Sequence, residues 1–134
     1  MRITKTITVK TKQNKEMINI TEKINDIITK NAINDGEVML FVPHTTAGVT
    51  INENADPDVK TDMLHGLNTI VKNLQEFKHA EGNSDAHIKS SLIGNTQTLL
   101  VHNGELLLGT WQGIYFMEFD GPRTRKINLR IIAS

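Results

Sequence analysis

Side chains that could carry out chemistry gather at three junctions of this sequence, between segments of regular apolar pattern. The first junction runs from His44-Thr45-Thr46 to Asn52-Glu53-Asn54-Ala55-Asp56. It joins two short apolar segments and opens a helical pattern, and loops on rigid elements often carry function. Helix capping alone explains Asp56, whereas His44 and Glu53 are candidates for a functional site.

The second junction is His79-Ala80-Glu81-Gly82-Asn83-Ser84-Asp85-Ala86-His87-Ile88-Lys89. It places two histidines, two carboxylates, an amide and a lysine within eleven residues. Imidazole together with carboxylate suits a divalent metal ion or paired acid–base work. The spacing of the two histidines fits neither a zinc finger nor an H-E-x-x-H motif, and a polar loop without function is an equal alternative.

The third junction combines the only tryptophan with a set of charged residues. It is Gly109-Thr110-Trp111-Gln112-Gly113, followed by Glu118, Asp120, Arg123 and Arg125. An indole suits stacking on a flat ring, but a tryptophan that fills the core is the commoner case. The two arginines could hold a phosphate through paired N–H groups, or they could form the solvated end of a hairpin.

The charge pattern excludes some functions and points to the middle of the chain. With 15 Lys+Arg and 15 Asp+Glu, the chain lacks the basic excess of a general nucleic-acid-binding protein. The absence of cysteine leaves histidine and carboxylate as the transition-metal ligands. All five histidines lie within the acidic stretch 31–121, and we interpret His65 and His102 as structural. No segment resembles a signal peptide or a bilayer span, so we expect a cytoplasmic protein.

The elements that must position these junctions follow from apolar periodicity and turn residues. Strands are predicted over 2–10, 37–42, 48–52, 96–102, 105–108, 113–119 and 126–132, and helices over 22–33, 57–76 and 84–93. Thr21, Asp56 and Ser84 are the predicted caps, and Asn103-Gly104 predicts a two-residue hairpin turn. We expect one α+β domain over residues 1–134, a compact, mostly antiparallel, barrel-like sandwich with two longer helices and one short helix.

The three junctions resemble the signatures of the YjbQ-like family, also called the secondary thiamine-phosphate synthase family. The stretch from His44 to Pro57 resembles its first signature. His79 with Glu81–Ser91 resembles the second, and Gly109–Ile114 with Glu118 resembles the third. The segment Asp120-Gly121-Pro122-Arg123-Thr124-Arg125 is similar to a common form of the family's ending.

The resemblance implies a small α+β fold that assembles as a homotrimer, with sites near subunit boundaries. It also implies a secondary enzymatic activity that couples hydroxymethylpyrimidine pyrophosphate to a thiazole phosphate, giving thiamine phosphate. Two other classes stay open: a metal-dependent hydrolase of unknown substrate, and a non-catalytic binding module for a phosphorylated metabolite. Neither nucleic acid nor a membrane is an expected partner.

On this hypothesis Lys89 contacts the leaving pyrophosphate, Trp111 walls the pyrimidine ring and Gln112 binds the ring edge. No organic cofactor is implied, but a divalent ion (zinc, nickel, manganese or magnesium) is compatible with the site. The expected catalytic residues are His44, Glu53, Glu81, Asp85, His87 and Lys89. The expected substrate-binding residues are Thr45, Asn52, Asn83, Trp111, Gln112, Glu118 and Arg123, and the expected metal ligands are His44, His79 and His87.

Overall fold

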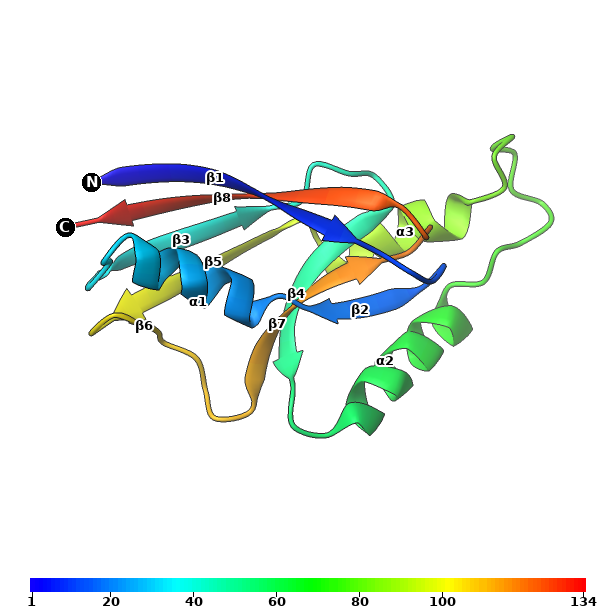
Figure 1. Ribbon diagram of the computed structural model, residues 1–134. Coiled ribbons are helices and arrows are strands. Elements are labelled where there is room, and N and C mark those ends of the chain that lie inside the picture. The colour runs from blue at the N-terminus through cyan, green and yellow to red at the C-terminus, as the bar shows by residue number, and fades with distance from the viewer.

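The computed structural model describes residues 1–134 as three helices and eight strands (Figure 1). The strands are β1 (Arg2–Lys10), β2 (Glu16–Asn19), β3 (Gly36–Phe41), β4 (Ala47–Glu53), β5 (Thr96–His102), β6 (Glu105–Leu106), β7 (Gln112–Glu118) and β8 (Thr124–Ala133). The helices are α1 (Thr21–Lys30), α2 (Pro57–Ile70) and α3 (Ser84–Ile93). This mixture of helices and strands confirms the predicted α+β class.

The strands form two sheets in which every neighbouring pair is antiparallel. The larger sheet has the order β1-β8-β3-β5-β6, and the smaller sheet has the order β2-β7-β4. Because the first and last long strands pair, with Arg2 opposite Ile132, the two chain ends lie side by side (Figure 1). The predicted mostly antiparallel architecture is therefore confirmed.

Strand β7 is buried on both faces and joins two apolar clusters. Ile114 and Phe116 belong to a core of 18 buried residues shared by the larger sheet, α1 and β4. Tyr115 and Met117 point the other way, into a cluster of five buried residues against which α2 and α3 pack. Since successive side chains of a strand alternate between faces, a continuous apolar run is what a doubly covered strand requires. The site lies beside the smaller cluster.

Helix α1 is shorter than predicted and begins differently. It ends at Lys30 rather than at residue 33, so it has ten residues, the same length as α3. The Thr21 side chain is not its cap: the hydroxyl accepts a hydrogen bond from the Ile114 N–H at 2.9 Å and donates to Asn19 Oδ1 at 2.7 Å. The threonine therefore ties the start of α1 to β7.

Helices α2 and α3 confirm the predicted segments with changes at their ends. Asp56 caps α2 by accepting from the Asp58 N–H at 2.9 Å, as predicted, but the helix stops at Ile70 instead of residue 76. The β-branched residues Thr69, Ile70 and Val71 have low helix propensity, and Ile70 is exposed. Neither propensity nor packing therefore favours a longer helix. In α3 the N-cap position belongs to Asn83 rather than Ser84, and Gly94 ends the helix with a φ of 95°.

The remaining differences are short strands. Strand β2 was not predicted, because four residues are too few to show a periodicity. Strand β6 has two residues instead of the four predicted. The Asn103-Gly104 turn is confirmed, with φ values of 53° and 81°. Among the three helices, none combines the length and the apolar character that crossing a bilayer demands.

Candidate functional site

A polar pocket lies where four segments meet: the loop before β4, the loop before α3, α3 from His87 onward, and the β7–β8 turn. It consists of two adjoining hollows of about 460 and 320 Å³ that share Thr45 and His87, and no apolar side chain lines either one. We call both together the histidine pocket. The larger hollow is lined by His44, Thr45, His87, Ser90, Ser91, Gly94 and Asn95. The smaller is lined by Thr45, Thr46, His79, Glu81, Asn83, His87, Asp120 and Arg123.

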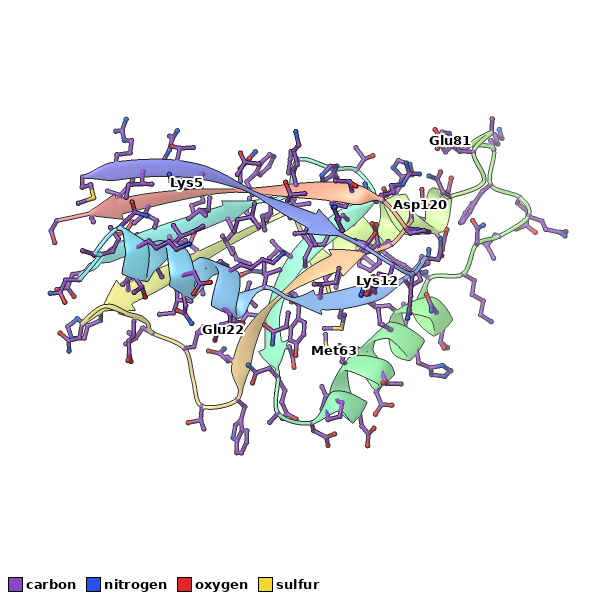
Figure 2. All side chains as sticks on the ribbon, in the orientation of Figure 1. Lys5, Lys12, Glu22, Met63, Glu81 and Asp120 are labelled. Atoms are coloured by element: carbon purple, nitrogen blue, oxygen red, sulfur yellow. The ribbon has the colours of Figure 1, made fainter.

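The pocket brings together residues of all three junctions of the sequence. The second junction meets the His44–Thr46 end of the first and the Asp120–Arg123 end of the third. Figure 2 shows Glu81 on the loop that precedes α3 and Asp120 near the end of β7, at the same end of the molecule. The rings of His79 and His87 pack edge to face, with centroids 5.4 Å apart and planes at 85°. Glu81 Oε1 lies 4.0 Å from His79 Nε2. The expectation that His44, His79 and His87 share a site therefore agrees with the pocket linings.

His44 is held in a defined protonation state. Its Nε2 accepts a hydrogen bond from the backbone N–H of Lys126 at 3.0 Å. A ring nitrogen that accepts carries no proton, so this contact assigns the proton of the neutral ring to Nδ1. Burial and then the nearby Arg125 guanidinium hold the pKa of His44 below its ordinary value of 6.5. His44 is thus a neutral imidazole with a single N–H donor.

Glu118 and Arg125 form a buried ion pair beneath the pocket wall. Glu118 is 0% exposed, and Arg125 binds it through Nε at 2.9 Å and through Nη2 at 2.5 Å. Burial alone would raise the pKa of the Glu118 carboxyl, but hydrogen bonds from Arg125 and Thr11 outweigh it and the pKa lies below its usual range. Arg125 Nη2 also donates to Thr46 Oγ1 at 2.8 Å. Glu118 therefore supports the wall and does not itself line the pocket, although it is a predicted substrate-binding residue.

Lys89 and Asp85 are likewise structural. Lys89 is 2% exposed and donates to Asn68 Oδ1 at 2.7 Å and to Asp85 Oδ2 at 3.0 Å. Lys15 lies 3.0 Å from the same carboxylate oxygen and also donates to the Phe119 carbonyl oxygen. Burial would raise the pKa of Asp85, but hydrogen bonds from Lys89 and Lys15 lower it. Neither Lys89 nor Asp85 lines the pocket, so the structure does not bring these two predicted catalytic residues into the site.

Arg123 retains hydrogen-bonding capacity toward the pocket. Its Nε donates to the Asp120 carbonyl oxygen at 2.8 Å, and its Nη2 donates to Asp120 Oδ2 at 2.9 Å. The Nη1 group has no partner within the protein. The pKa of Asp120 would be raised by burial, but hydrogen bonds from Asn83 and Arg123 bring it below the ordinary value. Arg123 is thus a fixed cation with three free N–H bonds, two on Nη1 and one on Nη2.

Four predicted residues lie at the opposite end of the β4–β7 pair. Ala47 faces Glu118 at one end of this pair, and Glu53 faces Gln112 at the other. Six residues of extended chain span about 20 Å, so the second end is remote from the histidine pocket. The four residues there are Asn52, Glu53, Trp111 and Gln112.

These four residues have local roles in this structure. The side chains of Asn52 and Glu53 accept from the N–H groups of Glu53 and Asp56, and Gln112 Oε1 accepts from the Gly109 N–H at 2.8 Å. Trp111 is 62% exposed. Within one chain they do not join the site, because the register of the two strands keeps the ends apart.

The residues present do not fit a metal ion in this arrangement. No group of three His, Asp or Glu side chains converges to hold one. His44 has its unprotonated nitrogen engaged by Lys126, and His79 and His87 meet edge to face. Two imidazoles with one distant carboxylate fall short of the three converging protein ligands that even an open zinc site keeps. The chemistry of the pocket is therefore derived from its own side chains.

Residues that the sequence reasoning missed complete the lining. Thr46 and Asp120 line the smaller hollow but were not among the predicted site residues. Thr46 lies in the first family signature, and Asp120 begins the segment that is similar to the family's ending. Ser90 and Ser91 line the larger hollow together with His87. They follow His87 by three and four positions, which places all three residues on one face of the predicted helix. The sequence alone could therefore have identified both serines. Nothing in the sequence pointed to Asn95.

Comparison with known proteins shows the family. A sequence model of the family described as UPF0047 protein YjbQ-like matches residues 5–134. A UPF0047 protein of Methanocaldococcus jannaschii is 52% identical, with 92% of this chain and 90% of the relative covered. YugU of Bacillus subtilis is 50% identical, with 96% and 98% covered.

Solved structures agree with this result. An uncharacterised YjbQ/UPF0047 protein of Clostridium acetobutylicum has 50% identity and a TM-score of 0.91, covering 95% of this chain and 98% of that one. A protein of unknown function from Sulfolobus solfataricus has 30% identity and a TM-score of 0.94, covering 100% and 99%. The family model, the relatives and the structures together show that this chain belongs to the YjbQ-like UPF0047 family.

Proposed function

We propose that this protein is an enzyme that acts on a phosphorylated small molecule bound in the histidine pocket. One observation carries the proposal: three imidazoles and the fixed guanidinium of Arg123 surround a pocket with no apolar lining. Such a lining favours a small polar anion over an apolar ligand. The preference comes from N–H donors rather than from a net positive charge, because Arg123 is paired with Asp120 and His44 is a neutral imidazole.

The anionic group is held by N–H donors whose directions are fixed. His44 offers Nδ1–H because its other nitrogen is bound to Lys126. Arg123 offers both N–H bonds of Nη1, while Nε and Nη2 each donate one hydrogen bond to Asp120. Charge-assisted hydrogen bonds of this type are the strong ones in phosphate recognition. Their orientation before binding reduces the entropy lost when the ligand arrives.

The pair His79 and His87 supplies the acid–base function. An imidazole exchanges protons near neutral pH, and the two rings are in contact at the shared wall of the hollows. Glu81 Oε1 lies 4.0 Å from His79 Nε2, within ion-pair distance of that ring. One ring can therefore donate a proton to a departing phosphate oxygen while its neighbour remains neutral.

The first reaction to test is the coupling of hydroxymethylpyrimidine pyrophosphate with a thiazole phosphate. The pocket supports the departure of pyrophosphate, since N–H groups of His44, His87 and Arg123 can donate hydrogen bonds to the charge that develops as it leaves the benzylic-type carbon. The lining offers no flat apolar surface for the pyrimidine, and Trp111 lies at the other end of β7 in the same chain. The pocket therefore supports one step of this reaction, the departure of pyrophosphate, and offers no support for binding of the pyrimidine ring.

Turnover of these two substrates, measured as thiamine phosphate formed, tests the reaction, and His87→Ala tests the site. We expect the variant to lose activity by on the order of 10²-fold while still folding. His102→Ala is the matched control, because His102 pairs with Asp35 far from the pocket and should keep full activity. Phosphate binding without turnover in any metabolite panel would favour a binding module, and no phosphate binding at all would overturn the proposal.

We further propose that the protein associates with copies of itself through the outer face of the larger sheet, as a homotrimer. Val38 and Leu40 of β3 point into the core, whereas Met39 and Phe41 of the same strand are exposed. Leu100 and Ile132 lie on the same face on either side of Glu37, so this face combines exposed apolar side chains with polar ones. The number three rests on the family resemblance. Light scattering that gives a monomer at micromolar concentration would contradict it.

A further inference from the structure

Asn83 contains the one buried side-chain polar atom of the structure that lacks a hydrogen-bond partner, its Oδ1. The residue is 9% exposed and lines the smaller hollow of the histidine pocket. Buried acceptors without a donor are destabilising, and folded proteins contain few of them. The position of this one, in the wall of the pocket, calls for a donor that the protein itself does not provide.

The orientation of the Asn83 amide is fixed by two carboxylates. Its Nδ2 donates to Asp120 Oδ2 at 2.8 Å and lies 3.4 Å from Glu81 Oε2. An ionised carboxylate only accepts hydrogen bonds, so exchanging the amide nitrogen and oxygen would set oxygen against oxygen. The atom without a partner is therefore the carbonyl oxygen, an acceptor.

Helix capping does not use this oxygen either. Asn83 occupies the N-cap position of α3, where asparagine normally accepts from an N–H of the first helical turn. No such bond forms here, because Asp120 on the β7–β8 turn draws the amide toward itself. Asn83 therefore does not cap the helix, and its buried acceptor stays unpaired in a wall that also includes His79 and Glu81. Both of these side chains are partly exposed, and their displacement by a ligand would open Oδ1 to it.

We infer that Asn83 Oδ1 is a specificity contact for a ligand that carries a hydroxyl or amine donor in addition to its phosphate. This inference rests on the proposed function, since the phosphate is held by His44, His87 and Arg123. One amide oxygen cannot by itself hold a metal ion, which needs several ligands, but it can accept from one O–H or N–H group. The substrate class is therefore a phosphate monoester with a donor a few atoms from its phosphorus.

A series of matched phosphates tests the inference in the full-length protein. The probes are ω-hydroxyalkyl phosphates of two, three and four carbons, each compared with the alkyl phosphate in which a methyl group replaces the hydroxyl. Affinities come from NMR titration of the backbone amides. At one chain length we expect the hydroxylated probe to bind on the order of tenfold more tightly, the effect of one satisfied hydrogen bond.

Two variants assign the preference to the residue. Asn83→Ala should lose the preference for the hydroxyl, read as the ratio of the two affinities within each pair, because loss of its bond to Asp120 acts on both members of a pair alike. Asn73→Ala is the matched control: its Nδ2 donates to the Gly82 carbonyl oxygen in the same loop, outside the pocket, so the preference should persist. If a variant unfolds, the comparison of hydroxyalkyl with alkyl phosphates in the wild-type protein still tests the inference.

The outcomes separate this inference from the proposed function. Equal affinities within every pair in the wild type would overturn the inference and leave phosphate binding intact, with a water molecule as the partner of Asn83. A preference that survives Asn83→Ala would also overturn it. Failure of every probe and of inorganic phosphate to bind would overturn the proposed function and this inference together.

Discussion

The backbone N–H of Lys126 lies 3.0 Å from Nε2 of His44 and donates a hydrogen bond to it. This contact links the start of β8 to the loop before β4, two segments that are more than eighty residues apart in sequence. Since the Arg125 side chain of the same strand binds Glu118 and Thr46, β8 controls both the charge and the position of this wall of the pocket. The first two predictions follow from that arrangement.

His44 should make folding stability depend on pH. The pKa of His44 in the folded protein lies below 6.5, so the unfolded chain binds a proton at a higher pH than the native state does. Its contribution is then fully present above about pH 6.5 and is lost as the pH falls toward the folded-state pKa. Urea unfolding between pH 7.5 and 5 measures this. His44→Gln keeps an acceptor for Lys126 and should flatten the dependence; an unchanged slope would contradict the assignment.

Glu118→Gln should destabilise the fold severely. The substitution removes the carboxylate that neutralises Arg125 while leaving the guanidinium buried, and breaking such a pair costs about 3–5 kcal/mol. The free energy of unfolding in urea measures the loss. The double variant Glu118→Leu with Arg125→Met removes both charges and should recover part of it. A single variant as stable as the wild type would show that the pair is not buried as described.

Much of the fold could be predicted because its signals are local. Alternating Thr, Ile and Val residues define β1, Asp56-Pro57 starts α2, and Asn103-Gly104 forms the hairpin turn. The misplaced ends have a different origin. Whether α2 continues past Ile70 depends on the core that its next turn would have met, and no local pattern contains that information.

The site was predicted in part for the same reason. His79, Glu81, Asn83 and His87 are close in sequence and remain together in the pocket. The first and third junctions instead flank long strands. Each residue of a strand adds about 3.4 Å to its length, so residues at its two ends lie far apart. Thus Glu53 stays with Trp111 while His44 joins His87. The burial of Glu118 and Lys89 depends on contacts across the sheet and between helices, which sequence proximity does not reveal.

Lys89→Met should weaken the fold without weakening phosphate binding. Lys89 is buried and bound to Asn68 and Asp85, so its loss leaves two polar groups short of a donor and costs about 1–3 kcal/mol. Lys15 remains beside Asp85 and limits the damage. Calorimetric unfolding and a phosphate titration of the folded variant measure the two effects. A stable variant with phosphate affinity reduced tenfold or more would restore Lys89 to a binding role.

The fluorescence of Trp111 should not respond to a ligand that binds in the histidine pocket of the same chain. It is the only tryptophan, it is exposed, and it lies about 20 Å along β7 from the histidine pocket. Adding inorganic phosphate to the wild type should therefore leave its fluorescence and its quenching by acrylamide unchanged, and Trp111→Ala should bind phosphate with unaltered affinity. Protection of Trp111 by phosphate, abolished in His87→Ala, would instead mean that the tryptophan end of one copy closes the histidine pocket of another. Dilution of the protein below its association concentration distinguishes these cases, since only contact between copies would make that protection disappear.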